Sequence, residues 1–410
     1  MTQVPSSEAL KIATLKGSPS FSPARTPYQT TRLTSLQGTK NRFNQALDEE
    51  LLDGWRSLVD SGPHAQPFYQ PEWFKAFADS FAAGREVQLL TVRNGASLLG
   101  VLPLMRTNSF FGRIPARVLT GLSGIHSCRY DLITGGQVHG DLASAAWQVL
   151  IEDQSWDVLE AQDVPERGSF IGIVECARRS GYLVGSWPTR KSPILTIPSS
   201  ARTGGDPFQN CPSRFRTLRK RLSSKLKTLH QRGTVSFSVE DSNLEEGLAR
   251  FFALESSGWK GANGSAIASD VQTTAFYSSI AKSFKERGQL RIYSMCLDNR
   301  PISMQLGLLM DGVYYSPKVA YDEAFASYSP GHLLVQHIIS DLAANNVRTF
   351  EFLGPRAFWK MVWAPECVEH RNWYIFRPNL RGHVLYSLTM RVAPRLRSLR
   401  HRVWGDPQEH

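Results

Sequence analysis

The residues from Asp322 to His332 form a segment that could bind an anion. Its end, Tyr328-Ser-Pro-Gly-His332, precedes a stretch with helical spacing of apolar residues. Pro330 suits the first turn of a helix, because its missing N–H would have no helical partner there. Gly331 lets a ligand approach the backbone closely, and the free N–H groups and dipole of a helix start favour a phosphate-type anion. The same residues also suit an ordinary helix cap. The choice between an anion site and a simple cap therefore depends on the surrounding elements.

Metal and disulfide chemistry are not indicated. His332 and His337 stand at i and i+5 on one predicted helix, whereas a zinc-binding pair prefers i and i+4. The cysteines lie far apart, at Cys128, Cys176, Cys211, Cys296 and Cys367. An odd number without a C-x-x-C pair argues against a disulfide framework and a zinc site. We therefore expect reduced thiols and no metal.

The elements around this segment have the order of a mixed sheet with one crossover helix. Three strands precede it, and a helix and a further strand follow it. The predicted bounds are 290–296, 301–309 and 313–319 for the three strands, about 330–345 for the helix and 349–353 for the last strand. Turns at Asp298-Asn299 and Asp311-Gly312 join the first three strands as hairpins. The anion-binding segment would lie between a strand end and a helix start.

The first half of the chain repeats part of this order. Residues 73–107 predict a helix with an aromatic face, a glycine, a strand, a short polar turn and a second strand, and residues 276–310 predict the same series. Gly84 corresponds to Gly288, and the turn at Asn94-Gly95 corresponds to the one at Asp298-Asn299. Two copies of one α/β unit are the simplest explanation, although two unrelated hairpins could look alike.

Length and composition indicate two folded domains with terminal extensions. The chain has 410 residues, of which 41% are hydrophobic, and this suits more than one core. We expect a disordered tail at 1–44, which is too polar to bury much apolar surface, domains at 45–200 and 201–378, and a basic helix and tail at 379–410. Further helices are predicted at 48–59, 141–152, 168–180, 213–232, 244–259 and 271–287, and further strands at 87–92, 98–105, 117–119, 156–159, 193–197, 234–239 and 373–376. No transmembrane or signal segment is recognisable, which favours a cytoplasmic location.

The positive charge is concentrated in two segments. The net charge is +11, and residues 212–238 and 370–405 contain many Lys or Arg residues and no acid. Such segments suit a nucleotide cofactor, nucleic acid or an anionic membrane. The helix predicted from about 382 has an apolar stripe opposite its arginines. It could make peripheral contact with a membrane, or it could simply cap the core.

The chain from Arg214 to Gly354 resembles the acetyltransferase domain of CelD-type proteins, GNAT-superfamily proteins that are linked to bacterial cellulose biosynthesis. The matching segments are Arg219-Lys-Arg-Leu222, Trp259-Lys260, Gly288-Gln-Leu-Arg291, Arg300-Pro-Ile-Ser-Met-Gln305, Lys318-Val-Ala-Tyr-Asp-Glu323, Tyr328-Ser-Pro-Gly331 and Phe352-Leu-Gly354. Residues 70–135, including Arg129-Tyr-Asp131, resemble the half that precedes this domain. The resemblance implies an α/β (α+β) fold of tandem GNAT-like domains, each with a mixed, mostly antiparallel central sheet flanked by helices. It also implies an N-acyltransferase, in the simplest case an N-acetyltransferase, that uses acetyl-CoA or another acyl-CoA.

The resemblance further implies that an amine attacks the thioester directly. Strand 313–319 would pair with the pantetheine arm, and one of its N–H groups would stabilise the oxyanion. Asp322 is our candidate base because it lies where the strand turns out, and Tyr321 or Tyr328 could protonate the thiolate. Each can equally be a turn or core residue. The candidate cofactor-binding residues are Val319, Ser329, Gly331, His332 and Leu333. The candidate substrate-binding residues are Lys318, Trp259 and Gln305.

One departure from the family leaves the acyl carrier open. The usual GNAT loop is Gln/Arg-x-x-Gly-x-Gly/Ala, whereas this chain has Ser327-Tyr-Ser-Pro-Gly331. The related Fem-type peptidyltransferases use aminoacyl-tRNA, and the basic helix 213–232 could bind such a donor, although the long coiled-coil insertion of many Fem-type enzymes is missing. We expect acyl-CoA and a small-molecule or sugar amine as partners. The alternatives are a tRNA-dependent transferase and a non-enzymatic accessory module for exopolysaccharide production.

Overall fold

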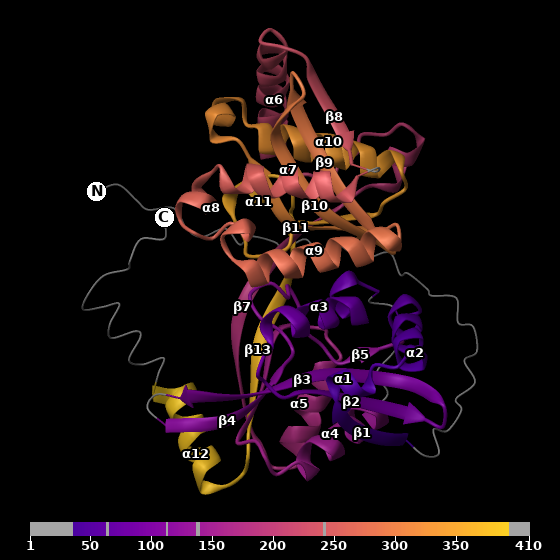
Figure 1. The fold of residues 1–410 in the computed structure, drawn as a ribbon, viewed down its shortest axis with the longest axis vertical. Helices are drawn as coiled ribbons and strands as arrows, with labels where there is room; N and C mark the ends of the chain where they lie inside the picture. The colour runs from indigo at the N-terminus through magenta and orange to yellow at the C-terminus, as the bar shows by residue number, and fades with distance from the viewer. Residues whose placement is uncertain (1–35, 63–64, 112–113, 137–139, 241–242, 393–410) are drawn as a thin grey trace, which may run out of the picture. The chain divides into compact units, whose positions relative to one another are not determined.

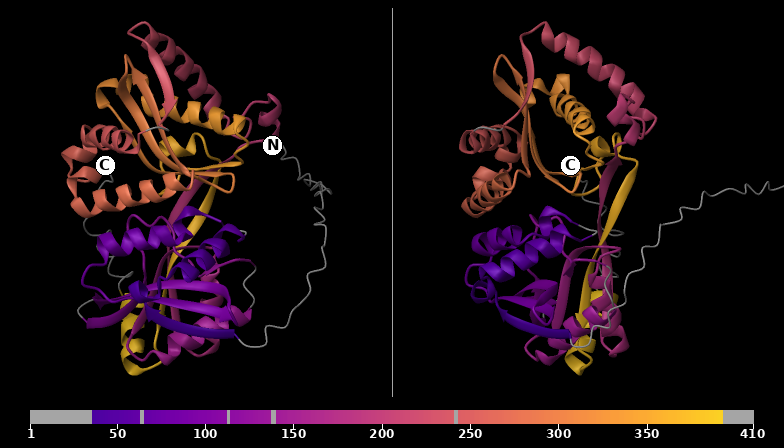
Figure 2. Two further views of the ribbon diagram at one scale, coloured as in Figure 1. Left: turned by 45° about the vertical axis from the view of Figure 1, so that its right-hand side comes forward. Right: turned by 90° about the vertical axis from the view of Figure 1, so that its right-hand side faces the viewer.

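The computed structural model describes residues 36–392, apart from 63–64, 112–113, 137–139 and 241–242. Its strands form a 13-stranded mixed sheet with helices on both faces (Figures 1 and 2). The first half contains β1 (Leu36–Arg42), α1 (Phe43–Ala46), α2 (Glu49–Asp60), η1 (Pro67–Tyr69), α3 (Pro71–Phe81), β2 (Val87–Asn94), β3 (Ser97–Phe111), β4 (Ile114–Gly121), β5 (Ile133–Thr134), α4 (Gly140–Glu152), β6 (Val158–Pro165), α5 (Phe170–Arg179) and β7 (Leu183–Thr196). The second half contains η2 (Ser199–Thr203), α6 (Arg214–His230), β8 (Val235–Val239), α7 (Leu244–Ser256), α8 (Trp259–Ala262), η3 (Ile267–Ser269), α9 (Val271–Glu286), β9 (Leu290–Leu297), β10 (Arg300–Met310), β11 (Val313–Tyr321), η4 (Glu323–Tyr328), α10 (Pro330–Ala344), β12 (Thr349–Glu351), α11 (Phe358–Met361), β13 (Glu366–Phe376), α12 (Leu380–Tyr386) and η5 (Ser387–Val392).

Local signals explain where these elements begin and end. The Asp48 carboxylate accepts a hydrogen bond from Leu51 N at the start of α2 (2.8 Å), a cap worth about 1 kcal/mol. Pro330 is the first residue of α10. The β9–β10 turn has positive φ at both Asp298 (49°) and Asn299 (66°), which is the geometry of a two-residue hairpin turn. Most predicted helices and strands are confirmed with small shifts at their ends, but three strands are much longer than predicted: β7 begins at Leu183, β13 begins at Glu366 and β3 ends at Phe111.

The prediction of a disordered tail at 1–44 is wrong for the last residues of that range. Leu36–Arg42 form β1, which pairs antiparallel with β2 from Leu36–Asn94 to Arg42–Gln88. Phe43, directly after β1, is 1% exposed. An edge strand needs few apolar residues, because hydrogen bonds along one side of its backbone hold it to its neighbour. The rest of the predicted tail, 1–35, lies outside the described residues.

The two halves of the sheet exchange strands. The order is β1-β2-β3-β4-β6-β13-β7-β12-β11-β10-β9-β8, so β13, from the second half of the chain, lies between β6 and β7. Residues 370–376 of β13 pair with β6, and residues 194–196 of β7 pair with β12. The predicted boundary near residue 200 is therefore a connection in the chain and does not divide the sheet.

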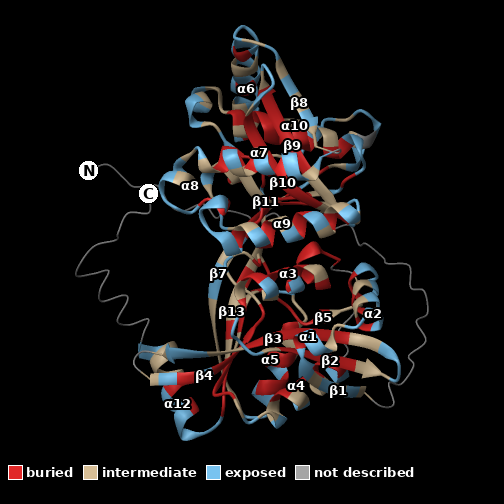
Figure 3. Ribbon diagram, in the orientation of Figure 1, coloured by how far each residue is buried: buried red, intermediate tan, exposed pale blue. Residues whose placement is uncertain are grey.

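The repeated units pack together through their first helices. The order α3-β2-β3-β4 recurs as α9-β9-β10-β11, and the corresponding Gly84 and Gly288 have φ of 73° and 68°. The buried Trp73 of α3 lies edge-on to Phe276 of α9, with ring centroids 5.4 Å apart. Both belong to a core that spans the two halves, and a second core lies under α6 and α10 on the other face of the sheet (Figures 2 and 3).

The predicted C-terminal helix begins at Leu380 as α12 and continues through η5 to Val392. The remainder of the predicted helix lies outside the described residues. Among the helices that the structure describes, none is both long enough and apolar enough to cross a membrane.

Candidate functional site

β11 and β12 separate beyond a short parallel pairing. Val313, Tyr314 and Tyr315 pair with residues 349–351, but β11 continues to Tyr321. The register with β10 also shifts, from Leu308–Tyr315 to Leu306–Lys318, so β11 carries one extra residue there. Pro317 lies in this bulge, where the absence of a proline N–H is tolerated. The bulge turns the last part of β11 into an open edge of the sheet.

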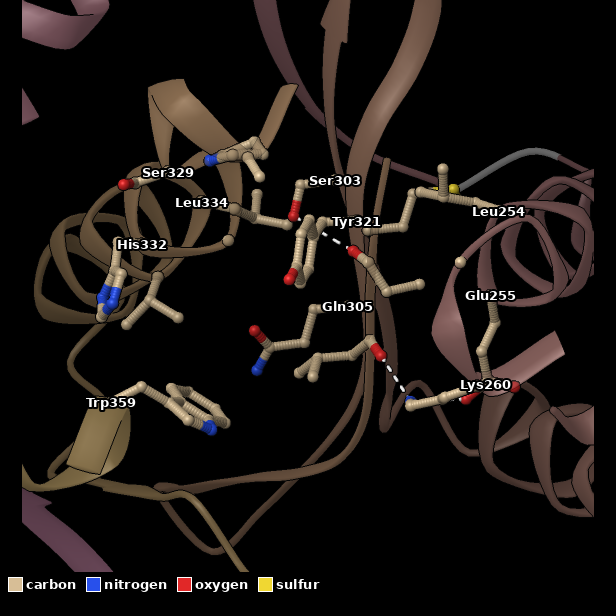
Figure 4. Close-up of a pocket in the computed structure, with 18 of the residues that line it drawn as sticks. Leu254, Glu255, Lys260, Ser303, Gln305, Tyr321, Ser329, His332, Leu334 and Trp359 are labelled. Carbon is tan, nitrogen blue, oxygen red and sulfur yellow. Dashed lines mark hydrogen bonds and ion pairs between the residues drawn. The ribbon is translucent and has the colours of Figure 1, made fainter. Parts of the chain in front are cut away.

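A cavity of about 500 Å³ lies along this open edge. Its walls come from α7 and α8, from β10 and β11, from the start of α10 and from Trp359 of α11. In Figure 4 the Gln305, Tyr321, His332 and Trp359 side chains surround one space, and Glu255 and Lys260 lie on the other side of β11. The cavity is large enough for a small ligand and brings a strand edge close to a helix start.

The start of α10 provides an electropositive wall. Ser329 adopts a left-handed conformation (φ 56°) and its carbonyl accepts from Leu333 N (3.1 Å). The preceding N–H groups, those of Gly331 and His332, are among those that a helix leaves without intrahelical partners. A Cβ placed on Gly331 would meet no heavy atom within 4 Å, so this glycine faces open space. Lys225 of α6 donates to Ser329 Oγ (2.7 Å) and adds a positive charge beside the helix start.

His332 is held as a neutral hydrogen-bond donor. Trp363 Nε1 donates to His332 Nδ1 (3.1 Å), so the neutral imidazole carries its hydrogen on Nε2. Burial, and then the charge of Lys225, lower the pKa of His332, which keeps the ring uncharged near pH 7. The ring cannot accept a proton at Nδ1 without losing the indole bond, so its available function is donation from Nε2.

A buried ion pair forms the opposite wall. Lys260 Nζ donates to Glu255 Oε1 and to the carbonyl of Val319, both at 2.8 Å. Glu255 is 3% exposed, and its other oxygen accepts from Ile267 N (2.8 Å). In an antiparallel strand the N–H and C=O of one residue point to the same side. The Val319 N–H therefore points, like its carbonyl, to the side of β11 away from β10.

Most of the predicted site residues meet at this cavity. Those that line it are Trp259, Gln305, Val319, Tyr321, Ser329, Gly331 and His332. Gln305 is 1% exposed and donates to Ser316 Oγ (2.5 Å), whereas Trp259 is 53% exposed. The cavity therefore brings these residues together, while their roles in binding and chemistry stay predictions.

Asp322 and Tyr328 lie outside the cavity lining. The Asp322 carboxylate caps η4 by accepting from Ala324 N (3.0 Å) and pairs with Arg300 (2.6 Å). These contacts match the turn role that was its alternative. Tyr328 packs beneath the Arg232 guanidinium, 5.6 Å from the ring centroid. Both residues therefore have contacts that explain them without catalysis.

Leu333 and Lys318 also point elsewhere. Leu333 is 3% exposed and belongs to the core under α10, whereas Leu334 lines the cavity, because neighbouring residues of a helix face different directions. Lys318 Nζ lies 4.9 Å from the centroid of the Tyr277 ring on α9. Burial lowers the pKa of Lys318, and its ammonium packs on an aromatic face outside the lining.

Several residues of the site were not predicted, and four of them are charged or aromatic. Glu255, Lys260 and Trp359 line the cavity, and Lys225 contacts its edge. The only sequence signals were general ones: Lys225 belongs to the basic segment and Lys260 to a matching family segment. Nothing in the local pattern distinguishes Glu255 from other acids on amphipathic helices.

The first half of the sheet is closed at the corresponding place. β4 and β6 pair in parallel at residues 118–120 and 158–160, as β11 and β12 do. Just beyond, the fully buried Tyr130 packs on Gly121, where an added Cβ would lie 2.6 Å from the ring. The Tyr130 hydroxyl donates to the carbonyl of Pro103 (2.7 Å). The repeat therefore does not provide a second open strand edge there.

Comparisons with known proteins agree with this architecture. Residues 216–361 match the family model of the acetyltransferase (GNAT) domain. Every residue that lines the cavity lies within that range. FemX is similar in structure, with a TM-score of 0.53 and 12% identity over 82% of this chain and 98% of FemX. The match in fold supports the predicted tandem GNAT-like architecture.

Two further structures match with lower scores. The C-terminal domain of an Agrobacterium fabrum protein described as a lysylphosphatidylglycerol synthetase has a TM-score of 0.49 and 11% identity, over 87% of this chain and 98% of that domain. A tandem GNAT protein from the clavulanic acid biosynthesis pathway has a TM-score of 0.44 and 13% identity, over 84% of this chain and all of that protein (100%). No curated protein sequence matches the chain.

Proposed function

We propose that this protein is an acyltransferase that moves an acyl group, in the simplest case acetyl, from an acyl-CoA to an amine. One observation carries the proposal: the open edge of β11 and the start of α10 border a single cavity, inside the range that matches a GNAT domain. A thioester on a long phosphate-bearing arm needs both features, a strand edge for the arm and an electropositive helix start for the phosphates. The acceptor would reach the thioester from the α7–α8 side.

The chemistry follows from the groups around Val319. The amine nitrogen attacks the thioester carbon, the C–N bond forms, and the carbonyl oxygen becomes an oxyanion that the Val319 N–H would stabilise. Glu255, rather than Asp322, is the proposed base because its buried carboxylate lines the cavity. The C–S bond then breaks, and the hydroxyl of Tyr321 would return a proton to the thiolate. His332 would donate from Nε2 to an oxygen of the carrier.

The experiment measures thiol release from acetyl-CoA and longer acyl-CoAs in the presence of a panel of amines, with the acylated product identified by mass. Gly331→Trp, which fills the cavity, should abolish both turnover and heat stabilisation by acyl-CoA. Gly331→Ala is the matched control, because its methyl group has room. A protein that no acyl-CoA stabilises and that releases no thiol would rule the proposal out.

Transfer from aminoacyl-tRNA is the second candidate. The fold similarity to FemX and the exposed basic face of α6, with Arg216 and Lys220, support it. It requires salt-dependent RNA binding, which Arg216→Glu with Lys220→Glu should abolish without affecting acyl-CoA binding. If RNA binding does not respond to this charge reversal, the tRNA alternative is removed.

The CelD-type resemblance extends the proposal to the cell envelope. On that basis the acceptor would be an amine used in bacterial polysaccharide biosynthesis, and the enzyme would act in the cytoplasm. A folded protein that transfers no acyl group to any amine but still supports exopolysaccharide production in a deletion strain would favour the accessory role instead.

A further inference from the structure

Exposed apolar side chains gather at the end of the molecule that carries α12. Leu380 is 83% exposed and Val384, one turn later, is 40% exposed. Val392, at the end of η5, is 41% exposed, and Phe110, near the end of β3, is 71% exposed. Figure 3 shows exposed residues on α12. Large apolar side chains in solvent at one place indicate a binding surface.

The α12 helix is firmly attached by its other face. Leu385 is 0% exposed and lies in a small core with Val158 and Phe376. Arg381 Nη2 donates to the carbonyl of Pro115 (2.5 Å), and Pro115 is the cross-strand partner of Phe110 in the β3–β4 pair. The first turn of α12 therefore lies against the strand pair that carries Phe110 (Figure 1). The exposed Leu380 and Phe110 are therefore carried by neighbouring elements.

The same region is positively charged. Arg117 and Arg381 share a single counter-ion, the carboxylate of Asp157, at 2.7 and 3.2 Å. Their side chains are 55% and 50% exposed, whereas that of Asp157 is 4% exposed, so solvent meets the cations. Arg391 adds a further cation beside the Tyr386 ring. The sequence from 370 to 405 contains arginines and no acid.

We infer that this surface, defined by Phe110, Leu380, Val384 and Val392 with the neighbouring arginines, docks on an anionic lipid bilayer. Apolar side chains would enter the boundary between headgroups and acyl chains while the guanidinium groups meet lipid phosphates. Nucleic acid matches this surface less well than a bilayer does, because exposed aliphatic side chains add nothing to contacts with a phosphate backbone. A second copy fits less well too, since a two-fold contact would bring identical cationic patches together. The inference does not depend on acyl transfer.

The test is sedimentation of the full chain with vesicles of phosphatidylcholine alone or mixed with phosphatidylglycerol, at low and high salt. Binding should require phosphatidylglycerol and weaken with salt. Leu380→Ser combined with Val384→Ser should lower the partition coefficient by about tenfold. Val271→Ser, which changes an equally exposed valine on α9 (84%), is the matched control and should bind like the unchanged protein.

Three outcomes would overturn the inference. The first is equal binding to both kinds of vesicle, and the second is unchanged binding by the double variant. The third is binding of duplex RNA that the same double variant abolishes while vesicle binding persists. If the double variant proves unfolded by circular dichroism, Phe110→Ser on the β3–β4 pair replaces it, with the same expected loss.

Discussion

Replacing Lys260 by Met tests the buried ion pair that ties α8 to β11. The Lys260 side chain is 22% exposed, but that of Glu255 is only 1% exposed. Without the ammonium, the carboxylate keeps its hydrogen bond from the Ile267 N–H but has lost its counter-ion, and it stays away from water. Removing one partner of a buried pair costs about 3–5 kcal/mol, a large fraction of the 5–15 kcal/mol by which domains are typically stable.

Glu255→Gln should cost less than Lys260→Met. The Gln carbonyl oxygen can still accept from Ile267 N, and the partly exposed Lys260 keeps its bond to the Val319 carbonyl while reaching water. We expect a loss of about 1–2 kcal/mol. The double variant, Lys260→Met with Glu255→Gln, should be no less stable than Lys260→Met alone, because it buries no unpaired carboxylate. The interaction energy between the two substitutions should be about 2 kcal/mol.

Urea unfolding followed by tryptophan fluorescence measures these differences. The exposed Lys282→Met on α9 is the control and should change stability by less than about 0.5 kcal/mol. If Lys260→Met is no more destabilising than Lys282→Met, the Glu255 carboxylate does not depend on the ammonium of Lys260. Activity gives a second readout: with Glu255 as base, Glu255→Gln should lose about 10²–10⁴ in kcat. Full activity in that variant would exclude Glu255 as the base.

Three further predictions concern the carrier site and the pH dependence of stability. Gly331→Trp should weaken CoA binding, measured by calorimetry, by at least about a hundredfold, or about 2.7 kcal/mol. Gly331→Ala should change the affinity by less than about threefold. Equal affinities of the two variants would contradict CoA binding in this cavity. Lys225→Met should weaken CoA binding about tenfold and reduce the salt dependence of that binding. Lys227→Met, which changes an exposed lysine nearby on the same helix, should leave both unchanged. Equal effects of the two substitutions would contradict a direct contribution of Lys225 to the carrier site. Burial, and then Arg129, lower the pKa of His370 to about 3, while an unfolded histidine titrates near 6.5. The stability that depends on a neutral His370 is therefore fully present above pH 6.5 and is lost as the pH falls toward 3. At pH 5 the free energy of unfolding should be lower by about 2 kcal/mol because of this group. In His370→Gln, the free energy of unfolding by urea should therefore fall less between pH 7 and pH 5 than in the unchanged protein. An equal fall in both proteins would contradict this role of His370.

Much of the architecture could be predicted because its signals are local. Asp48, Asp298-Asn299 and Pro330 mark their helix start or turn within a few residues of chain. The alternation of apolar residues sets each strand, and the order of strands around Pro330 predicts a helix start beside a strand end. The similarity between 73–107 and 276–310 also predicts the repeated order that the structure has.

Which side chains face the cavity was decided only by tertiary packing. Leu333 and Leu334 are adjacent in sequence, yet one enters the core and the other lines the cavity, because the faces of α10 are set by what packs against it. Asp322 is next to the site in sequence, but Arg300 and the η4 cap hold its carboxylate.

By itself, the sequence determined the elements, their order and an electropositive helix start at Tyr328–His332, since hydrogen-bond capping and hydrophobic periodicity act over a few residues. The tertiary structure decided what that helix start faces. It exchanged β7 and β13 between the halves, opened β11 at its bulge, and brought Lys225 and Lys260 to a site far from them in the chain. Such contacts depend on how sheet and helices pack over long separations, and no local pattern encodes them.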